Sequence, residues 1–214
     1  MPTIPGLPDT PPELLALAAA LGWTSGIRLY AVVFLTGLAG TTGWIELPPG
    51  LQLLEHPVVL AGSATMLLVE FFADKLPLVD TLWDAIHTLI RIPAGAALAA
   101  GALGADGSTI MWLAALMGGG LAATSHTAKM TTRAAVNTSP EPFTNVSVSL
   151  LEDGFVIFML WLSATYPIAF AGVLAVSIVM AVALVIVLFK FLRTVMREVP
   201  KLFAGRRPPA QGSR

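Results

Sequence analysis

The residues best placed to do chemistry recur at helical spacing within an apolar segment. Four ionisable residues are separated by four, three and four positions: Asp80, Asp84, His87 and Arg91. In a helix, residues at this spacing fall on one narrow stripe. Ionisable groups inside a membrane segment cost several kcal/mol unless they are paired or hydrated, so they normally face a bundle interior or a cavity. The stripe therefore indicates a candidate functional site.

An acidic pair precedes this stripe. Glu70 and Asp74 are four positions apart, so they share one helix face. Leu76-Pro77 follows and predicts a turn between two helices. The two faces can then meet across a helical hairpin. This would gather four carboxylates and one imidazole with the cations Lys75 and Arg91.

Three interpretations of this cluster stay open. The first is a proton or cation relay that uses Glu70, Asp74, Asp80, Asp84, His87 and Arg91. The second is a set of structural ion pairs, such as Asp84 with Arg91 or Asp80 with Lys75. The third is a divalent metal site, for which Glu70, Asp74, Asp84 and His87 are weak candidates because no sharp motif such as HExxH occurs. The sequence identifies no cofactor.

A second polar set lies in a later apolar segment and contributes hydrogen-bond donors and positive charge. Lys129 and Arg133 are four positions apart and share a face. With Arg28 they predict a binding site for an anionic or zwitterionic group, formed by Ser25, Arg28, Thr124, Ser125, His126, Lys129 and Arg133. The alternative is that the hydroxyl groups only bond to packing partners.

A short motif is repeated one hundred positions apart. Residues 21–25 read LGWTS and residues 121–125 read LAATS, and a basic residue follows each within four positions. Ser and Thr are good helix N-caps. The pattern predicts an inverted repeat of three plus three segments, with a broken or re-entrant helix at Ser25 and at Ser125. An ordinary kinked helix is the alternative.

Composition sets the class of protein. Of 214 residues, 56% are hydrophobic, only 12% are charged and none is cysteine, whereas soluble domains contain about 25% charged residues. This excludes a soluble globule, a disordered chain and a nucleic-acid binder that works by general basic charge. It also excludes a disulfide scaffold and a thiol nucleophile. We expect an all-α, polytopic membrane protein with about six segments, at 12–40, 57–73, 79–103, 108–136, 154–166 and 168–189. Glu152 and Asp153 would cap the fifth.

The chain divides into a Pro-rich leader at 1–11, a first membrane repeat at 12–103, a second at 104–195 and a basic tail at 196–214. Seven of the twelve Lys and Arg residues follow position 189, so the positive-inside rule places the C-terminus in the cytoplasm. Six full spans would put the N-terminus on the same side.

Three stretches resemble an uncharacterised family of small bacterial integral membrane proteins. They are SGIRLYAVVFLTGL (25–38), VEFFADKLPLVDTLWDAIHTLIRIPAG (69–95) and SHTAKMTTRAAVNTSPEP (125–142). The resemblance runs from about residue 15 to about residue 190. It implies a multi-pass protein of the bacterial inner membrane and no particular activity.

The function we expect is that of a small transporter with a polar site at the membrane midplane. Its substrate would be an anionic or zwitterionic small molecule, an ion or a lipid phosphate, and transport would be coupled to a proton or cation. Membrane lipid and a second copy of the chain are the predicted partners, and nucleic acid is not. The alternatives are an intramembrane enzyme acting on a lipid headgroup and a structural or assembly subunit. No nucleophile motif supports the enzyme.

Overall fold

The computed structural model describes residues 12–76, 79–104, 109–138 and 142–204. Within these ranges the chain forms helices and no strand, as predicted. The elements are α1 (Pro12–Thr41), η1 (Pro49–Glu55), α2 (Pro57–Ala73), α3 (Val79–Leu103), α4 (Thr109–Val136), α5 (Pro142–Thr165) and α6 (Pro167–Ala204).

Several of these helices are long and apolar enough to cross a bilayer. In the described residues α1, α3, α5 and α6 qualify singly, and η1 with α2 qualifies as a pair bent by 68°. The chain is therefore a multi-pass membrane protein. α4 does not qualify, because basic and hydroxyl side chains interrupt its apolar sequence. The six predicted segments exist as helices, but only four or five meet this criterion of length and composition, and α1, one of the four, is bent back at Arg28.

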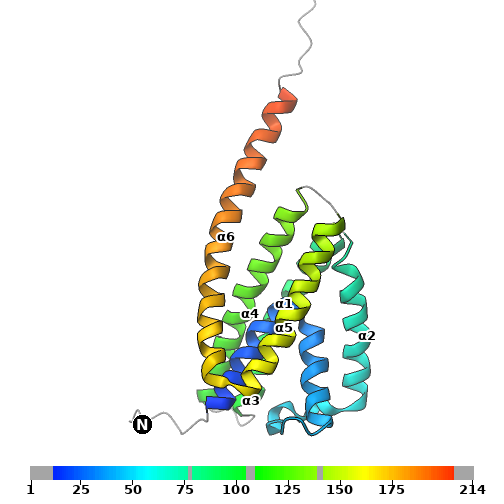
Figure 1. Ribbon diagram of the computed structural model, residues 1–214, viewed down its shortest axis with the longest axis vertical. Helices are drawn as coiled ribbons and strands as arrows, with labels where there is room; N and C mark the ends of the chain where they lie inside the picture. Colours follow the sequence, from blue (N-terminus) through cyan, green and yellow to red (C-terminus); the bar gives the residue numbers. More distant parts are fainter. Residues whose placement is uncertain (1–11, 77–78, 105–108, 139–141, 205–214) are drawn as a thin grey trace, which may run out of the picture.

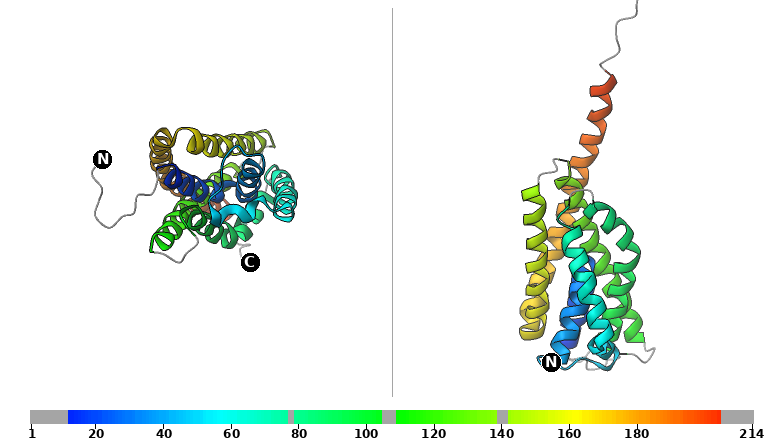
Figure 2. Two further views of the ribbon diagram at one scale, coloured as in Figure 1. Left: turned by 90° about the horizontal axis from the view of Figure 1, so that it is seen from below. Right: turned by 90° about the vertical axis from the view of Figure 1, so that its right-hand side faces the viewer.

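α1 folds back on itself. Its backbone leaves the helical conformation at Arg28 (φ −142°, ψ 75°), and both of its ends lie at the same end of the bundle (Figures 1 and 2). Leu17 and Leu38 line one cavity of about 400 Å³, although a straight helix would hold them about 30 Å apart. The re-entrant break predicted at Ser25 thus occurs three residues later.

The break predicted at Ser125 is wrong, because α4 is helical throughout. Ser125 does not cap a helix N-terminus. Its hydroxyl donates to the carbonyls of Ala122, one turn earlier, and of Trp23 in α1. The first segments of the two supposed repeats therefore differ, one being a hairpin and the other a continuous helix.

The remaining helices run alternately up and down (Figure 1). α1 begins at the lower end of the bundle and α6 finishes at the upper end. The expectation that both termini lie on one side assumed six full spans. It is wrong, because α1 is not a full span. α2 meets α3, and α4 meets α5, at the upper end.

α5 begins at Pro142, not at Gly154. Proline is favoured at the first position of a helix because its missing N–H would be unpaired there. Glu152 and Asp153 consequently lie in the middle of α5, so their predicted capping role is wrong. α6 continues to Ala204, as expected from the basic stretch that follows the apolar segment 168–189.

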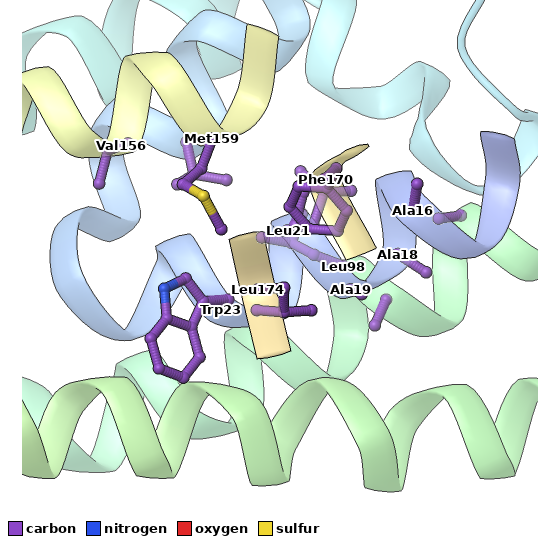
Figure 3. Close-up of a cluster of buried hydrophobic side chains, with 14 of the residues drawn as sticks. Ala16, Ala18, Ala19, Leu21, Trp23, Leu98, Val156, Met159, Phe170 and Leu174 are labelled. Carbon is purple, nitrogen blue, oxygen red and sulfur yellow. The ribbon is translucent and has the colours of Figure 1, made fainter. Parts of the chain in front are cut away.

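Small residues let α1, α3 and α4 cross closely. A β-carbon on Gly22 would lie 2.6 Å from the Cα atom of Gly118, and one on Gly95 would lie 2.5 Å from the Ser25 hydroxyl oxygen. Close helix contact through small residues is characteristic of membrane proteins. Beside this crossing, apolar side chains from α1, α3, α5 and α6 pack together, including Leu21, Leu98, Met159 and Phe170 (Figure 3). This packing fixes the helices that carry the polar residues.

Candidate functional site

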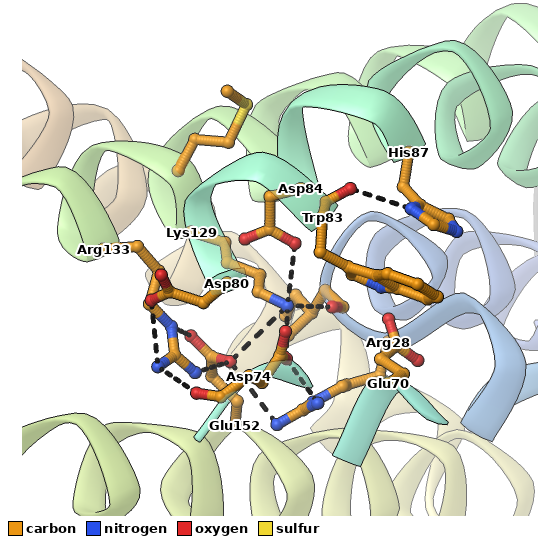
Figure 4. Close-up of polar contacts among 12 residues, drawn as sticks. Arg28, Glu70, Asp74, Asp80, Trp83, Asp84, His87, Lys129, Arg133 and Glu152 are labelled. Carbon is orange, nitrogen blue, oxygen red and sulfur yellow. Dashed lines mark hydrogen bonds and ion pairs between the residues drawn. The ribbon is translucent and has the colours of Figure 1, made fainter. Parts of the chain in front are cut away.

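Charged side chains carried by α1, α3, α4 and α5, and by the C-terminal end of α2, meet in one cluster (Figure 4). Within the described part of the chain, four cations and four carboxylates are almost completely buried: Arg28, Arg91, Lys129, Arg133, Glu70, Asp74, Asp80 and Asp84. At the edge of this cluster lie Lys75, Glu152 and Asp153. Five cations face six carboxylates, a formal charge of −1, so a single bound proton would neutralise the cluster.

Arg91 joins α2 to α3. Its guanidinium lies 2.5 Å from Glu70 Oε1 and 2.6 Å from Asp84 Oδ1. The predicted pairing of Asp84 with Arg91 is confirmed. The two stripes predicted to face each other across a hairpin do so, and Arg91 is the group that bridges them.

Lys129 links this pair to the rest of the cluster. Its ammonium lies 2.8 Å from Asp74 Oδ2 and 3.2 Å from Asp84 Oδ1. Arg28 also pairs with Asp74. Burial would raise the pKa of the Asp74 carboxyl, which follows the last residue of α2, but the charges of Lys129 and Arg28 outweigh burial and lower the pKa below its ordinary value of 3.8.

The three cations predicted to hold an anion converge on a single oxygen, Glu152 Oε2. Arg133 lies 2.8 Å from this atom, Arg28 lies 3.7 Å away and Lys129 lies 3.8 Å away. All three cations are buried, whereas the Glu152 side chain is 13% exposed. The three cations of the predicted anion site are thus brought together, and an internal carboxylate lies among them.

α4 also supplies hydrogen bonds to the backbone of α1 next to the break. The carbonyls of Gly26 and Ile27 contact His126 Nδ1 and Lys129 Nζ, each at 3.1 Å. Carbonyls at the end of a helix lack donors from their own helix and carry the negative end of its dipole. Ser125 and His126 therefore stabilise the α1 hairpin, and Lys129 does so while it pairs with carboxylates.

Three buried carboxylates use only one of their two oxygens. Among the residues that the structure describes, Glu70 Oε2, Asp74 Oδ1 and Asp84 Oδ2 have no hydrogen-bond partner. Buried polar atoms are normally paired, so these three oxygens are exceptions within the cluster. The described residues contain no group of three His, Asp or Glu side chains placed to hold a metal, and the metal interpretation gains no support.

Some predicted residues lie apart from the cluster. Ser25 donates to the carbonyl of Gly22 within α1, and Thr124 donates to the carbonyl of Gly120 within α4. His87 is buried near the cluster but contacts the Trp83 carbonyl and the Tyr30 hydroxyl rather than a charged group. These side chains have local structural partners.

The predicted pair of Asp80 with Lys75 is wrong. Asp80 accepts a hydrogen bond from Asn137 at 3.0 Å and lies 3.8 Å from Arg133. The Lys75 ammonium instead donates to Ser149 at 3.3 Å. Asp80 thus belongs to the α4 side of the cluster, whereas Lys75 faces α5.

A polar stripe on α5 was not predicted from the sequence. Arg28 donates to Ser149 Oγ at 2.8 Å and pairs with Asp153 at 2.9 Å. Arg133 donates to Asn145 Oδ1 at 2.7 Å. Residues 145, 149 and 152 have helical spacing, which would have revealed the stripe had this stretch been recognised as helix.

A groove of about 730 Å³ gives access to the cluster. It lies between α4, α5 and α6, with a contribution from α1. Its walls are mainly apolar, and Lys129 and Glu152 are its charged lining residues. Glu152 therefore faces both the buried cations and an open groove.

Comparison with known proteins identifies one family. Its model, described as Domain of unknown function (DUF4126), matches residues 15–187. No curated protein and no solved structure matches the chain.

Proposed function

The chain belongs to the DUF4126 family, whose function is unknown, and from its site we propose that it is a small membrane transporter coupled to a proton or cation. Its substrate carries an anionic group, alone or within a zwitterion. The observation that carries the proposal is the position of Glu152 Oε2, which three buried cations surround and which borders an open groove.

The arrangement couples a proton to an anion. While Glu152 is ionised, its carboxylate pairs with the cations and excludes another anion. A proton on Glu152 neutralises the carboxylate. The neutral carboxyl group then attracts the three cations only weakly. A substrate anion can then take the place of the carboxylate. Proton uptake and anion binding are thus linked at one position.

A continuous chain of ion pairs connects this position to α2. It runs from Glu70 to Arg91 at 2.5 Å, to Asp84 at 2.6 Å, to Lys129 at 3.2 Å and to Glu152 at 3.8 Å. The free oxygens of Glu70 and Asp84 lie along it. In the relay that we propose, Glu70 and Asp84 are the carboxylates that hold the proton. Arg91 keeps its own protons and only positions the two carboxyl groups, because a guanidinium is not deprotonated in proteins.

We propose that α2 is the helix that moves relative to the rest of the bundle during transport. This helix buries only Ser63, Glu70 and Ala73, while Leu68 and Phe72 on its other face are more than half exposed. Its upper end is held by the ion pairs of Glu70 and Asp74. Protonation of these carboxylates would release α2 from the bundle. The opposite directions of the α2–α3 and α5–α6 pairs (Figure 1) are compatible with an inverted repeat of these elements.

The test uses purified protein in liposomes with a pH gradient and a panel of anionic and zwitterionic solutes. We expect wild type to show gradient-dependent flux, and Glu70→Gln with Asp84→Asn to abolish it. Glu46→Gln is the matched control, because Glu46 is exposed and outside the cluster. The proposal fails if wild type and the double variant behave identically across the panel.

A structural role is the second candidate, because every buried cation in the described cluster has a carboxylate partner. This role needs the ion pairs for stability alone. Wild type would then show no gradient-dependent flux, whereas Arg91→Met would still lower the free energy of unfolding. Flux in wild type that Glu70→Gln with Asp84→Asn abolishes, in protein that remains folded, would exclude a purely structural role.

A further inference from the structure

We propose that the substrate is a lipid with a phosphate headgroup, which enters through the groove between α4, α5 and α6 (the lateral groove). This inference rests on the proposed transport function and names its substrate class. The acyl chain lies against the apolar walls, and the phosphate takes the place of the Glu152 carboxylate.

The lateral groove suits an acyl chain. Its apolar walls include Val148, Leu151, Phe155, Met180 and Leu184. α5 and α6 separate above the turn that joins them, and α4 lies behind the space between them (Figure 1). The groove therefore opens sideways toward lipid. A water-soluble anion would have to lose its hydration beside these walls, which is costly. An apolar acyl chain has no such hydration to lose.

The charges at the base of the groove suit a phosphate. Arg28, Lys129 and Arg133 lie within 4 Å of the oxygen that the phosphate would replace. Arginine is well suited to phosphate because its planar donors can bond two oxygens at once. A phosphate monoester has three terminal oxygens, and three cations converge on the site.

A further unpaired donor is buried in a residue that lines the same groove. Trp23 is 3% exposed, lines the groove, and its indole N–H has no hydrogen-bond partner in the described structure. Buried indole N–H groups usually find a partner. A headgroup or ester oxygen of a lipid in the groove would supply one. This observation is independent of the charges.

The test measures the quenching of Trp23 fluorescence by phosphatidic acid with brominated acyl chains, in detergent micelles. The protein used has its other four tryptophans replaced by phenylalanine. We expect quenching by brominated phosphatidic acid at a mole fraction about tenfold lower than by brominated phosphatidylcholine. Glu152→Gln should strengthen the phosphatidic acid effect about tenfold at neutral pH. Equal quenching by the two lipids overturns the inference.

Gly154 offers a variant that blocks the groove. It lines the lateral groove, and a β-carbon there would meet no atom within 4 Å, so Gly154→Phe can fill the space without a backbone clash. Gly172→Phe is the control, since Gly172 is equally open and does not line the groove. Quenching should disappear in the first variant and persist in the second. Unchanged quenching in Gly154→Phe contradicts the inference.

A soluble anion is a separate outcome. If inorganic phosphate binds more tightly in Glu152→Gln than in wild type, and brominated lipid does not quench, the substrate is a free anion. The lipid inference is then wrong while the proposed transport function stands. If neither ligand binds and no solute of the panel moves across liposomes, both fail.

Discussion

Replacing Arg91 by methionine removes the cation that holds two buried carboxylates. Glu70 and Asp84 lie 2.5 and 2.6 Å from the guanidinium, and all three side chains are at most 1% exposed. Removing one partner of a buried ion pair costs about 3–5 kcal/mol, because the other charge stays buried without compensation. Arg91→Met leaves Glu70 without its cation, whereas Asp84 keeps Lys129, so we expect a loss of about 4 kcal/mol in the free energy of unfolding.

Glu70→Gln should cost less, about 3 kcal/mol, because Arg91 keeps Asp84 as a partner. Arg91→Met combined with Glu70→Gln should be more stable than the sum of the two single effects predicts, by roughly 1–3 kcal/mol, since Arg91 and Glu70 are in contact. Unfolding by denaturant in micelles, followed by helical circular dichroism, gives these values. The exposed control Glu46→Gln should change stability by less than about 0.5 kcal/mol.

A second readout reports the position of α2. The chain contains no cysteine. Ala73→Cys therefore introduces a single thiol on the buried face of α2, at a position that is 8% exposed. Adding Glu70→Gln should speed the reaction of this thiol with a maleimide, because it weakens the ion pair with Arg91 that holds α2 against α3. A loss below about 1 kcal/mol for Arg91→Met, or unchanged labelling, would refute the reasoning.

Three further predictions concern the helix crossing, the α1 break and pH. Gly22→Leu should prevent stable folding, because its side chain would clash with the backbone of Gly118, whereas Gly172→Leu should fold normally; size-exclusion chromatography in detergent separates the two results. Ser125→Ala should lower the free energy of unfolding by about 1 kcal/mol, because the hydroxyl bond to α1 is lost, and denaturant unfolding measures it. The pKa of Asp74 is lowered by its neighbouring cations, so its contribution to stability is complete above pH 3.8 and is lost as the pH falls through the lower pKa of the folded state; wild type should lose thermal stability in this range, and Asp74→Asn should lose less.

The helical stripe at Asp84 and Arg91 could be predicted because helix periodicity alone places these residues on one face. The α1 hairpin was also visible in the sequence, although its break lies at Arg28. Local sequence could not distinguish Ser25 from Ser125, because the two motifs are alike. The difference lies in tertiary contacts, since Ser125 bonds to α1 from within an intact helix.

The partners of the cations could not be predicted from spacing. Periodicity shows which face a residue occupies, but not which helix packs against it. The sequence suggested an acidic half and a basic half that could meet, but not that Lys129 pairs with Asp74, just after α2, and with Asp84 of α3. Glu152 was predicted to cap a helix rather than to join the site, because the polar start of α5 resembles a loop. That residue changed the interpretation most, because it occupies the predicted anion site.

The pH dependence of anion movement in Glu152→Gln tests the central claim most directly. Protein in liposomes is assayed for transfer of inorganic phosphate and of labelled phosphatidic acid over a range of pH. The account predicts that wild type moves its substrate faster as the pH falls, and that Glu152→Gln moves the same substrate rapidly at every pH. If Glu152→Gln keeps the pH dependence of wild type, Glu152 does not control the anion site.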